Sequence, residues 1–177
     1  LQWREQRPDI IYIFSKDILR HRRAQKEDAV WLKKGEEYKD ETLSVRAFGS
    51  TDVGVSFLLQ AGGKKIFHAG DLNNWHWMDE STEAEWKGAE KNFLHELDDL
   101  YAYTPEVDVA MFPVDPRLGK EYMRGAGQFV TKIKTHIFVP MHFTPEYARA
   151  NAFRDFAEAH GVRFVSLTHR GQKIEIE

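Results

Sequence analysis

The sequence predicts a layered α/β domain of the α+β kind, in which helices pack on a sheet. Its 177 residues fit a single domain. A hydrophobic fraction of 42%, with 13% aromatic residues, is enough to form a buried core. The apolar segments form a series of short strands and then alternate with helices, a pattern typical of layered domains that combine helices with a sheet.

Short strands and turns are predicted in the first third of the chain. The β-branched and aromatic run Ile10–Phe14 has the length of a buried strand. Residues 15–17 can cap a short helix that continues to Arg23. Two further strands are predicted on either side of a turn at residues 33–36, over Ala29–Leu32 and Leu43–Phe48.

The two most specific local signals are a hairpin and a helix. Strands over Val53–Ala61 and Lys64–Ala69 flank Gly62-Gly63, and glycines adopt the positive φ angles that a two-residue hairpin turn needs. Thr82 and Glu85 form a capping-box pattern, which predicts a helix that starts there and continues until Pro105.

Strands and helices alternate in the remainder of the chain. The predicted elements are a strand over Val107–Val114, a helix over Lys120–Lys134 weakened by two glycines, a strand over His136–Met141, a helix from Thr144-Pro145 to Gly161, and strands over Arg163–Leu167 and Lys173–Glu177. Pro140 has no N–H for a central ladder, so it is expected at an edge or at the exit of its strand.

Composition excludes several classes of function. The 25 basic and 28 acidic residues leave a net charge of −3, which argues against nucleic acid or an anionic membrane as the main partner. The absence of cysteine excludes disulfides and thiolate ligands, so a metal would need His, Asp or Glu. No apolar run has the length of a membrane span. We therefore expect a soluble, cytoplasmic protein with a small-molecule substrate.

Three predicted strands run directly into a polar residue that could act chemically. These residues are Asp71, Asp115 and His142. Sites of α/β proteins form where strands end at one edge of a sheet. Asp71 can reach a metal or can satisfy its own turn, and His142 can be a ligand or a structural histidine. Asp115 can orient a ligand, but the following proline favours a simple turn.

Other polar residues give weaker signals. His76 lies between two tryptophans in the loop that follows Asp71, where it could contact substrate or simply take part in packing. His68 lies within a strand and is expected in the core or behind a ligand rather than as a ligand itself. The remaining candidates are expected on the surface: His95, His160, His169 and the basic cluster Arg20–Arg23.

Taken together, the motifs resemble the metallo-β-lactamase superfamily. The resemblance rests on Ile66–Asp71, Val107–Pro113 and Val139–Phe143, whose order and spacing are similar to the C-terminal half of that family. It implies a partial αββα sandwich in which residues 1–177 form the C-terminal two-thirds of a single domain. It also implies that Asp71 is the aspartate that bridges two metals and that His142 is the last histidine ligand, with one or two zinc ions in the complete enzyme.

The sequence departs from the family pattern at two places. The first ligand motif, His-x-His-x-Asp-His, does not occur in these 177 residues, and we expect it upstream of Leu1. The middle histidine of the family corresponds to Ser50, and Asp52 could take its place. With two expected ligands, we predict weak zinc binding and negligible hydrolase activity for the chain alone.

Two functions remain open at this stage. The first is a metal-dependent hydrolase in which zinc-activated water attacks an ester, amide or phosphoester. The alternative is a non-catalytic remnant of the fold that binds a partner. For the hydrolase we predict that Asp71 and His142 lie within about 8 Å of each other. We also predict that the loop Asn73–Trp77 borders the site, with Asn73, His76 and Trp77 as substrate contacts.

Overall fold

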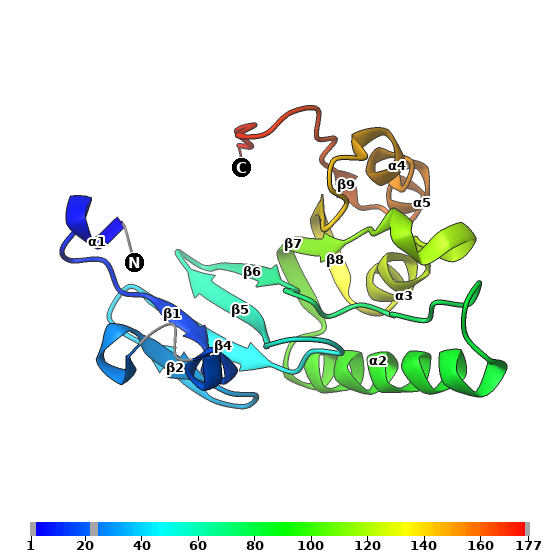
Figure 1. Ribbon diagram of the computed structural model, residues 1–177. Helices are drawn as coiled ribbons and strands as arrows, with labels where there is room; N and C mark the ends of the chain where they lie inside the picture. The colour runs from blue at the N-terminus through cyan, green and yellow to red at the C-terminus, as the bar shows by residue number, and fades with distance from the viewer. Residues whose placement is uncertain (1–2, 22–24, 176–177) are drawn as a thin grey trace.

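The computed structural model describes residues 3–21 and 25–175 (Figure 1). The elements follow one another in the order α1 (Trp3–Gln6), β1 (Ile13–Ser15), η1 (Lys16–His21), η2 (Lys26–Asp28), β2 (Val30–Leu32), β3 (Glu37–Lys39), β4 (Leu43–Phe48), β5 (Ser56–Ala61), β6 (Lys64–His68), α2 (Glu83–Tyr103), β7 (Glu106–Pro113), η3 (Pro116–Glu121), α3 (Arg124–Lys132), β8 (Lys134–Met141), α4 (Tyr147–Asn151), α5 (Arg154–Ala159) and β9 (Arg163–Phe164). The elements labelled η are 3₁₀ helices.

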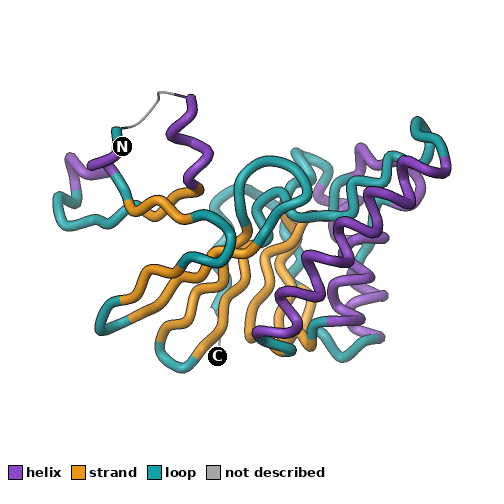
Figure 2. Tube along the Cα trace, turned by 90° about the horizontal axis from the view of Figure 1, so that it is seen from below, coloured by secondary structure: helices purple, strands orange, loops and turns teal. Residues whose placement is uncertain are grey.

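A seven-stranded mixed sheet organises the molecule. Its strand order is β3-β4-β5-β6-β7-β8-β9. The strands from β3 to β6 are antiparallel, and those from β6 to β9 are parallel. A separate parallel pair, β1-β2, lies at the end of the molecule opposite to α2 and the helices that follow it (Figure 2). The structure therefore has the layered α/β class that the sequence predicts.

The main core fills the space between the sheet and the helices. Strand side chains alternate between the two faces, so that Phe138 of β8 packs in this core while its neighbours Ile137 and Val139 belong to a smaller cluster on the opposite face. Phe112 of β7 stacks on Phe129 of α3 with ring centroids 4.6 Å apart. The phenylalanines of the main core with no exposed surface are Phe67, Phe93, Phe112, Phe129, Phe138 and Phe153.

The hairpin and the long helix form where the sequence predicts them. Gly62 and Gly63 have φ angles of 56° and 76°, as the tight turn between β5 and β6 requires. Thr82 caps α2, because its side chain accepts from the backbone N–H of Glu85 while the Glu85 carboxylate accepts from the backbone N–H of Thr82. The helix ends at Tyr103. These signals involve only residues close in the sequence, so they predict the hairpin and the helix without knowledge of the tertiary structure.

The N-terminal elements differ from the prediction. Strand pairing starts at Ile13, later than the predicted Ile10–Phe14, and it joins β1 to β2 rather than to the large sheet. Ile11, in the predicted strand, is 55% exposed. The predicted helix to Arg23 is the 3₁₀ helix η1, and residues 22–24 lie outside the described part. Strand β3 was not predicted, because its polar residues lack the alternation of apolar and polar side chains that indicates a strand.

The C-terminal helices are more broken than predicted. The helix predicted over residues 120–134 is divided into η3 and α3, with Gly119 at a φ of 81° inside η3. The helix predicted from residue 144 begins at Tyr147 and is divided into α4 and α5. Pro140 does lie at the exit of β8, beyond the two residues that pair with β9. Strand β9 is shorter than Arg163–Leu167, residues 173–175 form no strand, and residues 176–177 are not described.

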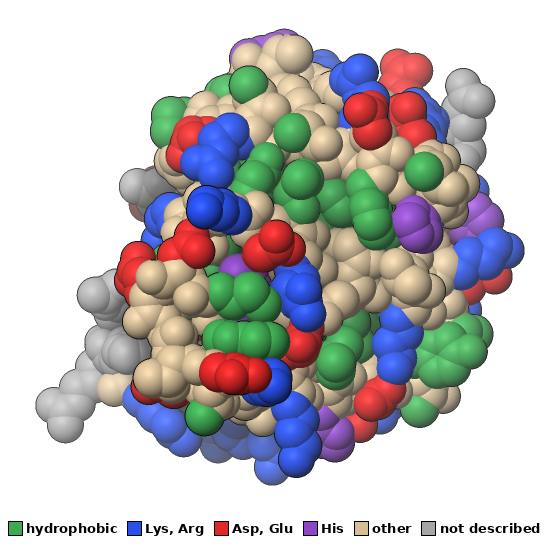
Figure 3. Space-filling model, turned by 90° about the vertical axis from the view of Figure 1, so that its right-hand side faces the viewer, with side chains coloured by type: hydrophobic (Ala, Val, Ile, Leu, Met, Phe, Trp, Pro, Cys, Tyr) green, Lys and Arg blue, Asp and Glu red, His purple; other side chains and the backbone are tan. Residues whose placement is uncertain are grey.

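The surface mixes both signs of charge. On the side shown in Figure 3, basic and acidic side chains are interspersed around hydrophobic ones. This distribution agrees with the near balance of 25 basic and 28 acidic residues. In residues 3–21 and 25–175, no helix combines the length and the apolarity that crossing a bilayer demands.

Candidate metal-binding site

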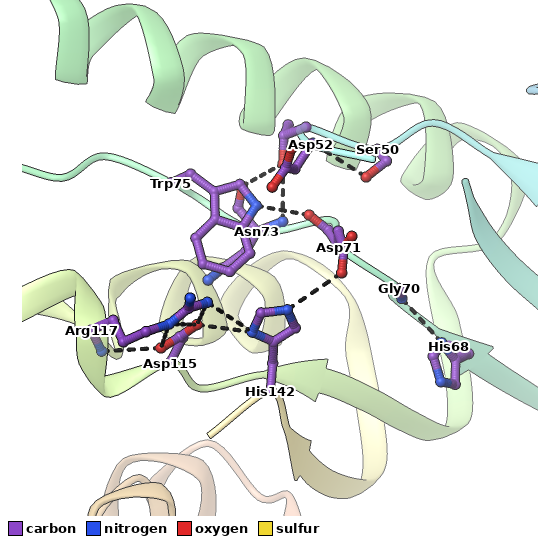
Figure 4. Close-up of polar contacts among 11 residues, drawn as sticks. Ser50, Asp52, His68, Gly70, Asp71, Asn73, Trp75, Asp115, Arg117 and His142 are labelled. Carbon is purple, nitrogen blue, oxygen red and sulfur yellow. Dashed lines mark hydrogen bonds and ion pairs between the residues drawn. The ribbon is translucent and has the colours of Figure 1, made fainter. Parts of the chain in front are cut away.

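The three polar strand ends meet at one edge of the sheet. Asp71 follows β6, Asp115 follows β7 and His142 follows β8, and these three strands are parallel neighbours. The Oδ1 atom of Asp71 lies 3.4 Å from Nε2 of His142 (Figure 4). The prediction that these two residues lie within about 8 Å is therefore confirmed. The sequence separation of the three residues is large, and only the parallel register brings them together.

His142 is held in one orientation by Asp115. Its Nδ1 atom lies 2.8 Å from Oδ2 of Asp115. Because a carboxylate oxygen accepts, Nδ1 carries the hydrogen and the Nε2 of a neutral ring presents its lone pair to Asp71. Metal-binding histidines are commonly fixed in this way by a carboxylate on the other ring nitrogen. Asp115 also caps η3, since it accepts from the backbone N–H of Arg117 at 3.0 Å. Asp115 therefore caps the turn, as the sequence favours, and also contacts the ring of His142, the candidate ligand.

Asp115 stays ionised although it is buried. Its side chain is 1% exposed. Burial alone would raise the pKa of this carboxyl, but hydrogen bonds from Arg117 and His142 outweigh it, so the pKa lies below its ordinary value. A carboxylate at this position is thus an acceptor throughout the neutral pH range.

The facing atoms of Asp71 and His142 fit a metal ion. When the ring is neutral, these two acceptors have their lone pairs directed at each other and repel unless a metal ion lies between them, whereas a protonated ring would form an ion pair with Asp71. Ligand atoms bound about 2.1 Å from a tetrahedral zinc lie about 3.4 Å apart, which is the separation found here between Oδ1 and Nε2. His142 also has a φ of 64°, in a region that residues other than glycine seldom adopt and that recurs at functional sites.

The described residues supply two candidate ligands and no third. Across residues 3–21 and 25–175, His, Asp and Glu side chains nowhere gather in a group of three that could hold a metal. Asp52 therefore does not complete the site as a substitute for the family's middle histidine in this structure. Its backbone N–H bonds to Ser50 Oγ at 3.3 Å, while the adjacent Thr51 hydroxyl binds the backbone of Asn73.

Trp75 covers the candidate site. Its indole Nε1 donates to the backbone oxygen of Asp71 at 2.8 Å, and its ring meets the His142 ring edge to face at 5.3 Å. It also stacks on Trp77 at 6.3 Å. Trp75 is not among the site residues predicted from the sequence, although its aromatic side chain and its position four residues after Asp71 are signals that could have identified it.

The three residues predicted to contact substrate differ in burial. Asn73 and His76 are buried, with exposures of 0% and 1%. The two ring nitrogens of His76 bond to the backbone, to Glu121 O at 3.1 Å and to the N–H of Met78 at 3.1 Å. Burial argues against direct substrate contact by Asn73 and His76. The two hydrogen bonds of His76 hold the loop, whereas the polar side-chain atoms of Asn73 have no hydrogen-bond partner among the described residues. Trp77 is half-buried and remains a predicted contact.

A polar network fixes the same loop to the helices behind it. The Asn74 amide donates to Gln128 at 2.9 Å and to Glu90 at 3.3 Å. Arg124 donates to the same Glu90 oxygen at 2.8 Å, and chiefly this hydrogen bond holds the pKa of Glu90 below its ordinary value. The loop that carries Asp71 and Trp75 is thereby tied to α2 and α3.

No other histidine whose side chain is described lies among the candidate ligands. His68 is exposed rather than in the core, and its Nδ1 accepts from the N–H of Gly70 at 3.0 Å, which supports the turn before Asp71. His95, His160 and His169 are exposed, as the sequence predicts. The side chain of His21 lies outside the described part of the structure.

Comparisons with known proteins identify the fold. No family model matches the chain, and no curated protein matches it in sequence. A solved structure of a proposed metal-dependent hydrolase from Parabacteroides distasonis is similar, with a TM-score of 0.60 and 14% identity over 89% of this chain and 64% of that one. Igni18, a metallo hydrolase from the archaeon Ignicoccus hospitalis, gives a TM-score of 0.56 and 17% identity over 92% of this chain and 67% of that one.

The chain has the metallo-β-lactamase fold. CmlA, a diiron β-hydroxylase from Streptomyces venezuelae, is also similar, with a TM-score of 0.52 and 13% identity over 84% of this chain and 35% of that one. At these identities the likeness establishes the fold alone. The chain spans 64% of the length of the Parabacteroides protein. Similar structures thus include metal-dependent hydrolases and an iron enzyme, so the chemistry must be argued from the site.

Proposed function

We propose that this chain is part of a metal-dependent hydrolase and supplies Asp71 and His142 to its zinc centre. The observation that carries the proposal is the 3.4 Å between Asp71 Oδ1 and His142 Nε2, which equals the edge of a zinc tetrahedron. The remaining ligands come, in this proposal, from residues outside the 177. A catalytic zinc generally has three protein ligands, and the described residues offer two.

Each residue of the site has a defined task in this proposal. Zinc, when bound, supplies the Lewis acidity that activates water at neutral pH. Asp71 and His142 hold the ion, and Asp115 keeps the His142 ring in position. Trp75 covers His142 and limits the access of bulk water to it. The resulting reaction is hydrolysis of an ester, amide or phosphoester.

A hollow next to the site has the size for a small-molecule substrate. It has a volume of about 570 Å³ and is lined mainly by apolar side chains, among them Met141, Phe143, Tyr147 and Leu167, with His142 at one side. Small-molecule pockets commonly have about 300–1,000 Å³ and mostly apolar walls. We propose a small-molecule substrate, a cytoplasmic location, and no nucleic acid or membrane partner.

Calorimetric titration with zinc tests the metal site. We expect weak binding with one zinc per chain, abolished in Asp71→Ala and in His142→Ala. The matched controls are Asp9→Ala and His160→Ala, which remove an exposed carboxylate and an exposed imidazole without touching the site. Equal zinc binding by all four variants would refute the role of Asp71 and His142. A tight site lost in Asp71→Ala would instead show that the chain already contains the remaining ligands.

The alternative function is a non-catalytic domain that binds a partner. The presence of only two candidate ligands among the described residues favours it. The coding sequence upstream of the first residue distinguishes the two functions. A His-x-His-x-Asp-His motif there supports the hydrolase, and a continuous upstream sequence without such a motif supports the binding domain.

A further inference from the structure

Arg117 contacts Asp115 more extensively than a turn requires. The backbone N–H of Arg117 completes the turn by donating to Oδ1. In addition, its Nε lies 3.0 Å from both carboxylate oxygens, and its Nη2 donates to Oδ2 (Figure 4). The Arg117 side chain is 62% exposed, whereas that of Asp115 is 1% exposed. The guanidinium therefore lies between a buried carboxylate and solvent.

The same carboxylate oxygen serves Arg117 and His142. Oδ2 of Asp115 accepts from Arg117 Nη2 and lies 2.8 Å from His142 Nδ1. Arg117 Nη2 also lies 3.4 Å from Nδ1, and because a guanidinium only donates, Nδ1 could accept from it only without its own hydrogen. The shorter contact to Oδ2 favours the hydrogen on Nδ1. A guanidinium has donors only, so Arg117 cannot replace Asp115 as the acceptor for the ring. Its planar fork does fix the plane of the carboxylate, and with it the direction in which Oδ2 faces His142.

We propose that Arg117 is a positioning residue of the candidate site: by fixing the Asp115 carboxylate, it keeps the hydrogen of His142 on Nδ1 and leaves Nε2 free to bind metal. This proposal rests on the proposed metal site. It adds Arg117, which contacts neither Oδ1 of Asp71 nor Nε2 of His142, the two atoms that would bind the metal. No sequence pattern indicates this role, because Arg117 follows a proline in a segment typical of an ordinary turn.

A purely structural role for Arg117 predicts a different outcome. If Arg117 only stabilises the turn at the start of η3, its loss lowers stability and leaves the His142 ring unchanged. If it positions Asp115, the freed carboxylate can rotate away from Nδ1, and the ring then exchanges between its two neutral tautomers. The state of the ring, rather than stability, separates the two roles.

The test uses Arg117→Met, Arg117→Lys and the control Arg7→Met. Arg7 makes a similar paired contact with Asp9 two residues away, but that pair is exposed and apart from the site. Nitrogen NMR of the metal-free chain, at a pH where the ring is neutral, reports which ring nitrogen of His142 carries the hydrogen. We expect Nδ1–H in the wild type and in Arg7→Met, and a mixture of tautomers in Arg117→Met.

Zinc titration gives the second readout. Removal of a partner behind a metal ligand commonly weakens metal binding about 10–100-fold, so we expect a loss in that range for Arg117→Met. Arg117→Lys has a single ammonium group in place of the planar guanidinium. Its zinc affinity should lie between those of Arg117→Met and the wild type. Should Arg117→Met unfold, the lysine variant decides the matter by the same two measurements.

The outcomes separate this proposal from the proposed function. Unchanged His142 signals in Arg117→Met, or in the lysine variant if only that one folds, would overturn the positioning role. If the wild type binds no zinc, the proposed metal site fails, yet the tautomer comparison in the metal-free chain still decides the role of Arg117. A mixed ring state that coincides with weakened zinc binding supports both.

Discussion

Substitution of Gly125 by alanine should destabilise the protein, although local rules predict the reverse. Gly125 lies in α3, where glycine is about 0.5–1 kcal/mol less favourable than alanine. In the structure, however, a Cβ at this position would lie 2.0 Å from Oδ1 of Asn73 and 2.9 Å from the backbone nitrogen of Asn74. Both atoms belong to the buried loop between Asp71 and Trp75 and have little freedom to move.

The expected size follows from these two opposing effects. Overpacking of a tight interior costs about 1–3 kcal/mol, and a Cβ 2.0 Å from Oδ1 of Asn73 places this position in the upper part of that range, about 2–3 kcal/mol, above the helix gain. We therefore expect a net loss of about 1–2 kcal/mol for Gly125→Ala. For a protein of this length, 1 kcal/mol corresponds to about 2–4 °C in the melting temperature, so the expected decrease is about 2–8 °C. The displaced loop should also weaken zinc binding through Asp71.

Two other glycines provide matched controls in thermal unfolding. Gly88 lies in α2 with nothing within 4 Å of its added Cβ, so Gly88→Ala should raise stability by the full helix gain. Gly127 in α3 would place its Cβ 3.4 Å from the Phe156 ring, an ordinary contact, so Gly127→Ala should be close to neutral or mildly stabilising. A stability gain in Gly125→Ala equal to that in Gly88→Ala would refute the packing argument.

Two further predictions concern a residue of the loop and a residue of the polar network behind it. His76→Ala should lower stability by about 1–3 kcal/mol, because it leaves the backbone of Glu121 and Met78 without partners, while zinc affinity measured by titration stays near the wild-type value. A stable variant with weakened zinc binding would point to the opposite role. The pKa of Glu90 is lowered from 4.5, mainly by the hydrogen bond from Arg124, so this pair stabilises the protein above that pH and the contribution is lost as the pH falls through the folded-state pKa. Denaturant unfolding as a function of pH should show this loss in the wild type and less of it in Glu90→Gln; identical profiles would contradict it.

The fold was predictable from the sequence where short-range signals act. The capping box at Thr82 and the glycine pair at Gly62 each satisfy a local geometric need, and both elements form as predicted. The predicted strand boundaries are wrong where pairing with a strand distant in the sequence determines them. The strand predicted over Ile10–Phe14 forms only from Ile13 onward, where the chain pairs with β2, its only strand partner in the described residues. Strand β3 consists of polar residues and forms because it pairs with β4.

The candidate site was predictable in part for the same reason. Strand ends followed by Asp71 and His142 are visible in the sequence, and the parallel order of β6, β7 and β8 then places them 3.4 Å apart. The sequence does not indicate in which direction each side chain of the loop Asn73–Trp77 points. Asn73 and His76 turn inward and Trp75 covers the site, because the loop packs against α2 and α3 and the backbone around it needs partners.

The sequence by itself determined the order of most strands and helices and the layered class, since these follow from periodicity, capping and strand ends. Strand ends made Asp71 and His142 candidates, and the resemblance to the metallo-β-lactamase superfamily implied their role as ligands. Only the tertiary structure decided that Asp115 and Arg117 lie behind His142 rather than in an isolated turn. The physical reason is that a hydrogen bond depends on the separation and direction of two groups. Between residues 25 to 27 positions apart in the chain, these quantities are set by the register of β7 against β8.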